Sequence, residues 1–87
     1  MKGKALTKGK LTREQYNTLR RDHVIKRELV IIKLICEEHT SDEIGEKVGI
    51  SGKRVDAIRL ELLRKTRSRN AIGIVKYAIK NKLYKVK

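Results

Sequence analysis

The sequence predicts an all-α fold in which four packed helices contain a helix-turn-helix and an extra short helix precedes them. Three observations lead to this prediction. The chain of 87 residues has no proline and six glycines, its Leu, Ile and Val recur at helical spacing, and several segments carry residue pairs that start helices. A chain of this length makes one domain with a three- or four-helix core, but it is too small for a roomy buried active site.

The segment 40–54, TSDEIGEKVGISGKR, has the spacing of a helix-turn-helix. Thr40 and Glu43 form a capping box, in which each side chain pairs with a free backbone N–H at a helix start. Gly49 stands where a glycine in the left-handed region would end this helix, and Ser51 offers the N-cap of the next one. The sequence therefore predicts two helices, joined by a tight turn, that cross at a steep angle.

Apolar and small residues in this segment predict how the two helices meet. Ile44 and Val48 are four residues apart and share one face of the first helix. Gly45 stands where a side chain would hold the second helix away from the first. Ile50 and Val55 occupy the two positions of a hydrophobic staple at the start of the second helix.

A further helix start precedes the motif. Thr12 and Gln15 form another capping box, which predicts a short helix near 13–22. Two apolar residues of the following segment, Leu29 and Val30, lie off its main apolar stripe. We expect the short helix to pack over them, because an apolar pair of this kind is usually covered by a neighbour.

The remaining helices complete the organisation of the domain. A core helix is predicted over 26–38 and a final helix over 70–81. Residues 1–25 form a basic flexible segment, disordered over 1–10 and carrying the short helix, and residues 26–87 form the helix-turn-helix domain. The apolar stripe of the core helix is Ile31, Ile32 and Ile35, and that of the final helix is Ala71, Ile74, Val75, Ala78 and Ile79.

Positive charge is concentrated in two parts of the chain. The net charge of +13 divides into +7 for residues 1–27, −4 for residues 28–50 and +10 for residues 51–87. Basic charge thus resumes where the second helix of the motif begins. This distribution predicts a polyanionic partner, and the helix-turn-helix favours double-stranded DNA.

The second helix of the motif, about 52–64, has two distinguishable faces. Val55, Ile58 and Leu62 recur at helical spacing and face the core. A lysine in the major groove suits guanine, an aspartate accepts from cytosine, and small apolar side chains meet the thymine methyl group. The predicted reading face is the opposite one, made of Lys53, Asp56, Ala57, Leu60 and Arg64.

Other basic residues are better placed for phosphate than for bases. Arg54 and Arg59 lie at the margins of the reading face, and Arg67 and Arg69 fall in the loop before the final helix. Such contacts set the position of a protein on DNA rather than its sequence preference. For Asp56 two interpretations stay open, a base contact and a favourable charge near a helix N-terminus.

From Lys26 to Leu83 the chain resembles the LuxR/NarL-type (GerE-like) effector domain of bacterial response regulators. The run LLRKTRSRNAIGIVKYAIKNKL is especially similar to the Bacteroidetes branch of that family. The residues that carry the resemblance are Arg27, Glu28, Ile31, Ile32, Leu34, Ile35, Glu43, Ile44, Val48, Ile50, Ser51, Val55, Leu62, Lys65, Val75, Ala78 and Ile79.

The resemblance implies a tetra-helical domain whose third helix reads the major groove and whose fourth helix mediates dimer contacts. The sequence departs from the family pattern at four positions, namely Ile25, Arg54, Asp56 and Ile58. Asp56 stands where many members have a lysine that contacts DNA. The receiver domain that family regulators carry upstream is not part of this sequence.

Other functional classes are disfavoured by the residues available. His23 and His39 have no Cys or acid at ligand spacing, so no metal site is expected. No nucleophile has a base and an orienting partner, and no cofactor or small-molecule motif is present, so the protein is not expected to be an enzyme. The longest apolar run is too short for a membrane span. Cys36 is expected to be buried and inert.

The final helix is expected to form a weak homodimer on DNA through Ile74, Tyr77 and Ala78, because a core this small cannot cover its whole apolar surface. The function predicted is a sequence-specific, double-stranded DNA-binding transcription regulator of the bacterial cytoplasm and nucleoid. The alternative is a protein-interaction module, or a regulator antagonist, that keeps the fold without reading DNA.

Overall fold

The computed structural model describes residues 11–86 and contains five α-helices and no strand within them. The predicted all-α fold is confirmed, while the predicted disorder of residues 1–10 lies outside the described residues. The helices are α2 (Arg13–Arg21), α3 (Lys26–Cys36), α4 (Ser41–Val48), α5 (Gly52–Lys65) and α6 (Ala71–Lys80).

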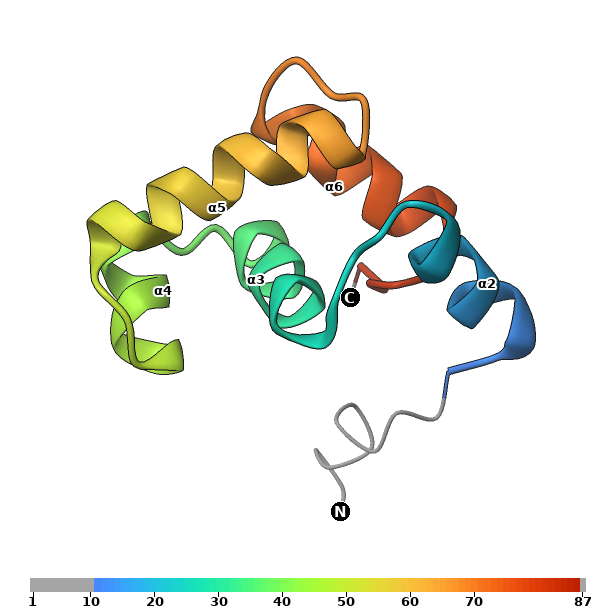
Figure 1. Ribbon diagram of the computed structural model, residues 1–87, viewed down its shortest axis with the longest axis horizontal. Coiled ribbons are helices and arrows are strands. Elements are labelled where there is room, and N and C mark those ends of the chain that lie inside the picture. The colour runs from blue at the N-terminus through green and yellow to red at the C-terminus, as the bar shows by residue number, and fades with distance from the viewer. Residues whose placement is uncertain (1–10, 87) are drawn as a thin grey trace.

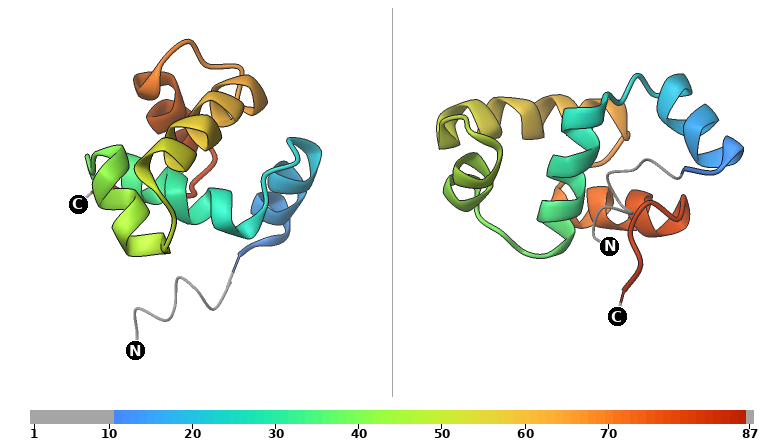
Figure 2. Two further views of the ribbon diagram at one scale, coloured as in Figure 1. Left: turned by 60° about the vertical axis from the view of Figure 1, so that its left-hand side comes forward. Right: turned by 90° about the horizontal axis from the view of Figure 1, so that it is seen from below.

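The helices pack as a bundle around α3, as Figure 1 shows. α4 lies at the N-terminal end of α5, α6 lies at its C-terminal end, and α3 packs against both α4 and α6. The two further views in Figure 2 place α2 at the end of the molecule away from α4. The arrangement leaves one long side of α5 without a neighbouring helix.

The core is built almost entirely from branched aliphatic side chains. α3 supplies four of them and therefore forms its centre, as expected for a helix with a broad apolar stripe. The buried apolar residues are Leu19, Val24, Leu29, Ile31, Ile32, Ile35, Ile44, Val55, Leu62, Ile74, Ala78 and Leu83.

The capping predictions for the helix-turn-helix are confirmed. The Thr40 hydroxyl accepts a hydrogen bond from the backbone N–H of Glu43 at 3.2 Å, and the Glu43 carboxylate accepts from the backbone N–H of Thr40 at 2.9 Å. Gly49 ends α4 with φ at +79°, in the left-handed region that favours glycine. The Ser51 hydroxyl accepts from the backbone N–H of Arg54 at 3.0 Å and starts α5.

Gly45 allows the turn to pass close to α4. A Cβ atom at this position would lie 2.5 Å from the carbonyl oxygen of Ile50, which is closer than real Cβ contacts. The obstacle is therefore first the backbone of the turn, and then the start of α5, where the Gly52 nitrogen would lie 3.2 Å away. The prediction that a side chain at Gly45 would separate the two helices is therefore correct, although the nearest obstacle is the turn rather than the second helix.

The core helix ends earlier than predicted. α3 stops at Cys36 rather than at residue 38, because Glu38 adopts a left-handed conformation with φ at +64°. The backbone N–H of His39 then donates to the carbonyl of Leu34 at 3.2 Å, which closes the last turn. Nothing in the local sequence indicates this end, since glycine usually occupies such a position.

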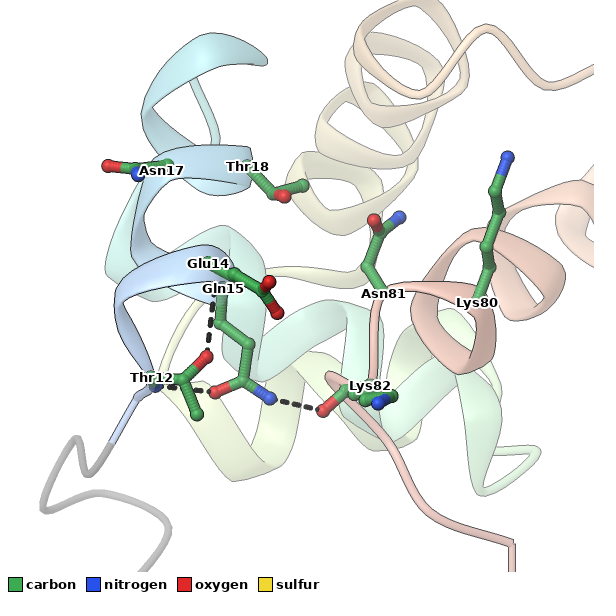
Figure 3. A pocket seen from close by; sticks show the side chains of 8 residues that line it. All are labelled: Thr12, Glu14, Gln15, Asn17, Thr18, Lys80, Asn81 and Lys82. Atoms are coloured by element: carbon green, nitrogen blue, oxygen red, sulfur yellow. Dashed lines mark hydrogen bonds between the residues drawn. The ribbon is translucent and has the colours of Figure 1, made fainter.

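α2 is attached to the end of α6. The Gln15 side chain accepts from the backbone N–H of Thr12 at 2.8 Å, as the predicted capping box requires, and its amide donates to the carbonyl of Lys82 at 2.7 Å (Figure 3). Leu29 is buried, but Val30 remains 40% exposed. The prediction that this short helix covers both residues is therefore wrong for Val30.

Candidate nucleic-acid interface

The free side of α5 carries the side chains that were predicted to read DNA. Val55 and Leu62 are completely buried, so the opposite side of the helix faces solvent. Ile58, which was predicted to face the core, is only half-buried. Arg59, at the margin, is also half-buried. The exposed residues of the helix are Lys53, Arg54, Asp56, Ala57, Leu60 and Arg64. The geometric division of the helix is thus correct, and contact with bases stays a prediction.

Leu60 is the most exposed large apolar side chain of the domain, with 68% of its surface accessible. It lies between charged residues, one helical turn from Ala57 on the same face. Both side chains are of the kind that contacts a thymine methyl group in the major groove.

Asp56 has a contact that the sequence did not reveal. Its carboxylate accepts a hydrogen bond from the hydroxyl of Ser41, the first residue of α4. The bond joins the two helices of the motif on the side that faces solvent. It favours a structural role for Asp56 over the direct base contact considered above.

A buried ion pair fixes the other end of α5. The ammonium group of Lys65 donates to both carboxylate oxygens of Glu28 on α3, at 2.8 and 2.9 Å, and to the carbonyl of His23 at 2.8 Å. Glu28 also accepts from the backbone N–H of Ile25 at 3.0 Å and so caps α3. A pair this well hydrogen-bonded orients α5 against α3, although its burial adds little net stability.

The loop between α5 and α6 presents the two arginines that were predicted to contact phosphate. Arg67 adopts a left-handed backbone with φ at +55°, and its guanidinium lies 3.6 Å from the carboxylate of Asp22. Arg69 is exposed, two residues later. Both side chains therefore reach solvent near the C-terminal end of α5.

Asp22 is the centre of a polar cluster that sequence reasoning missed. Its side chain is only 2% exposed, and it accepts hydrogen bonds from Arg21 at 3.1 and 3.0 Å and from the hydroxyl of Tyr77 at 2.7 Å. The Arg21 guanidinium, followed by Tyr77, holds the pKa of this carboxyl below its usual range against the effect of burial. Burial and the neighbouring carboxylate raise the pKa of Tyr77.

The predicted dimer contact needs correction. Ile74 and Ala78 are buried in the core of the chain itself, so neither side chain is free to contact a second subunit. Tyr77 is half-buried and engaged with Asp22. The exposed apolar residues of α6 are instead Ile72 and Ile79, the second of which belongs to the predicted apolar stripe of this helix.

Within 11–86, no three His, Cys, Asp or Glu side chains lie close enough together to hold a metal ion, and none of the helices has the length and apolar character of a membrane span. Cys36 is half-buried rather than fully buried, and burial raises the pKa of its thiol. The open hollow of about 450 Å³ in Figure 3 is lined by uncharged polar side chains, Glu14 and lysines.

Comparison with known proteins gives relatives for most of the chain. A segment of 58 residues, 67% of the chain, is 38% identical to the oxygen regulatory protein NreC of Staphylococcus carnosus and to that of Staphylococcus aureus strain JH9. These relatives support the LuxR/NarL helix-turn-helix family. The chain spans 27% of the length of each, so the similarity concerns only part of each relative.

Two further comparisons found nothing. No family model matches the chain. No solved structure matches it. The family is therefore supported by the NreC relatives, together with the helix-turn-helix geometry described above.

Proposed function

We propose that this chain is a sequence-specific, double-stranded DNA-binding transcription regulator whose helix α5 enters the major groove. One observation carries the proposal. The free side of α5 presents exposed Lys53, Ala57 and Leu60 in a single stripe, on the second helix of a fully capped helix-turn-helix. The second helix of this motif is the one that enters the groove in DNA-binding proteins.

In this proposal, the residues on and beside this stripe make different contacts with DNA, according to their chemistry. Lys53 donates to guanine O6 and N7, and Ala57 with Leu60 contacts thymine methyl groups. Arg64, at the end of the same stripe, completes the reading face. Arg54, Arg59 and the loop arginines Arg67 and Arg69 contact phosphate. These contacts set the position of the domain on the duplex.

Asp56 plays a different part in this proposal. Its bond to Ser41 holds the start of α4 against α5 and keeps the carboxylate at the edge of the interface. A lysine at this position would add attraction to DNA, whereas Asp56 removes some. The domain then depends on its other basic residues for affinity.

The same observation supports a second candidate of another class. An exposed leucine beside an exposed carboxylate, Leu60 and Asp56, is also what a protein-binding helix presents. In that case the domain would be an interaction module or an antagonist of another regulator. The charge of +13 favours DNA over this alternative.

The assembly proposed is a weak homodimer that forms on DNA through the exposed side of α6. Ile72 and Ile79 are seven residues apart and lie on the same side of this helix. One short helix buries much less than the roughly 1,200 Å² of a stable interface, so two half-sites about one helical turn apart are needed to hold both subunits. We also propose a bacterial cytoplasmic, nucleoid-associated setting, within the Bacteroidetes-like branch that residues 62–83 resemble.

A salt titration tests DNA binding against protein binding. We expect the affinity for a duplex of mixed sequence to fall by about 10³-fold between roughly 50 and 200 mM salt if six phosphates are contacted, because each contact releases counterions. An affinity that falls less than about tenfold over this range would exclude an interface made by Lys and Arg on phosphate.

A further inference from the structure

A small basic cleft lies between the turn that joins α2 to α3 and the C-terminal end of α5. It is open to solvent and has a volume of about 190 Å³. Four of its six lining side chains are cationic and one is acidic. The lining residues are Arg21, Asp22, His23, Arg64, Lys65 and Arg67.

The buried carboxylate of Asp22 holds two guanidinium groups at the mouth of this cleft. Arg21 bonds to it through Nε and a terminal nitrogen, and Arg67 approaches it to 3.6 Å. The two arginine side chains are nevertheless 62% and 71% exposed. Their remaining N–H groups are therefore accessible to solvent, and both groups are oriented by a carboxylate that is itself almost fully buried.

The acidic residues near the cleft do not cancel the positive charge of its lining residues. Lys65 is neutralised by Glu28 in the buried pair, and Asp22 offsets only one of its two arginines. Arg64 pairs with Glu61, but both groups are exposed, and such a pair contributes little and yields readily to a stronger anion. A phosphate diester carries the charge and the acceptor oxygens that fit such a site.

The cleft also continues the proposed reading face. Arg64 lines the cleft and lies on the same stripe of α5 as Leu60, four residues and about 6 Å farther along the helix. A helix that lies in a major groove about 12 Å wide meets the phosphate backbone when it leaves the groove. The cleft is therefore placed where the backbone would pass.

We infer that Arg21, together with Arg67, clamps a DNA backbone phosphate in this cleft, so that the turn after α2 extends the contact beyond the helix-turn-helix. This inference rests on the proposed function. It gives α2 a role in DNA binding that the domain predicted over 26–87 does not include. The bonds of Gln15 to Lys82 and of Asp22 to Tyr77 hold α2 in place for it.

The test is the salt dependence of binding to a duplex of mixed sequence, measured by fluorescence anisotropy with the whole chain. Arg21→Ala should lower the slope of log K against log salt by about 0.9, the value for one phosphate contact. Arg21→Gln, which retains a donor for Asp22 but no charge, should do the same. Arg13→Ala is the matched control, because Arg13 is exposed on α2 and does not line the cleft.

Three outcomes would contradict either the phosphate clamp or the proposed function. Slopes that are unchanged in both Arg21 variants, or lowered equally by Arg13→Ala, overturn the clamp. If the parent chain itself shows no salt-dependent binding, the proposed function fails first. If inorganic phosphate raises the melting temperature of the parent but not of Arg21→Gln at constant ionic strength, while the salt slope on DNA is the same in the parent and both Arg21 variants, the cleft holds a free anion and the DNA assignment is wrong.

Discussion

The hydroxyl of Ser41 on α4 donates a hydrogen bond to the carboxylate of Asp56 on α5. This bond crosses from the first to the second helix of the helix-turn-helix and joins the start of α4 to the first half of α5. It gives Asp56 a partner inside the protein, on the face that is proposed to meet DNA.

Replacing Asp56 should therefore lower the stability of the domain but raise its affinity for DNA. We expect Asp56→Ala to lower the free energy of unfolding by about 0.5 to 1.5 kcal/mol, the net value of one hydrogen bond, and to raise the affinity for a duplex of mixed sequence. Ser41→Ala is the control, since it loses the same bond but retains the charge. Urea melts and anisotropy give the two quantities, and weaker DNA binding by Asp56→Ala would instead indicate a base contact.

The turn of the motif depends on the conformation of Gly49. Gly49→Val should destabilise the domain by more than about 1 kcal/mol, because a β-branched residue is strained at φ of +79°. Gly49→Asn should be tolerated better, since Asn adopts the left-handed region more readily. Thermal melts of the three proteins compare them, and equal midpoints for the Val and Asn variants would show that the strain is absent.

Asp22 should make the domain sensitive to acid. Its pKa in the folded state is lowered from 3.8, first by Arg21, so its contribution to stability is present above pH 3.8 and is lost as the pH falls through the folded value. We expect the melting temperature of the parent to exceed that of Asp22→Asn at neutral pH, and this difference to shrink on acidification below pH 3.8. Glu43 and Glu61 titrate in both proteins and cancel. A difference that does not change with pH would contradict the assignment.

Cooperative assembly on DNA should depend on the exposed side of α6. We expect the parent to sediment as a monomer at micromolar concentration and to bind a palindromic duplex two to one with cooperativity. Ile72→Ala and Ile79→Ala should abolish the cooperativity and leave single-site binding intact. Val30→Ala, at an apolar residue exposed on α3, serves as the control. Cooperative binding by both α6 variants would exclude this helix as the dimer element.

The features predicted correctly are those that depend on residues close together in the sequence. The capping boxes of Thr12 and Thr40, the cap at Ser51 and the left-handed Gly49 each involve residues at most three positions apart. The spacing of Val55 and Leu62 similarly determines which side of α5 is exposed, because helical geometry is the same everywhere.

The features that were missed depend on contacts between distant segments. Asp22 and Tyr77 are 55 residues apart, and nothing near either residue indicates the other. Ile72 and Ile79 could not be told from the core residues Ile74 and Ala78 by spacing alone, since apolar residues surround much of α6 and its neighbours decide which side is covered. The end of α3 was missed because Glu38 occupies a position that usually requires glycine.

The most direct test of the central claim is selection of duplexes from a random-sequence library by the parent chain and by three variants. We expect the parent to enrich a defined motif. Lys53→Ala and Leu60→Ala should each relax one base position by about 1 to 3 kcal/mol, whereas Arg69→Ala should weaken all sequences equally. If the parent enriches no motif, or if the three variants lose affinity equally on specific and random duplexes, α5 does not read DNA in the way proposed.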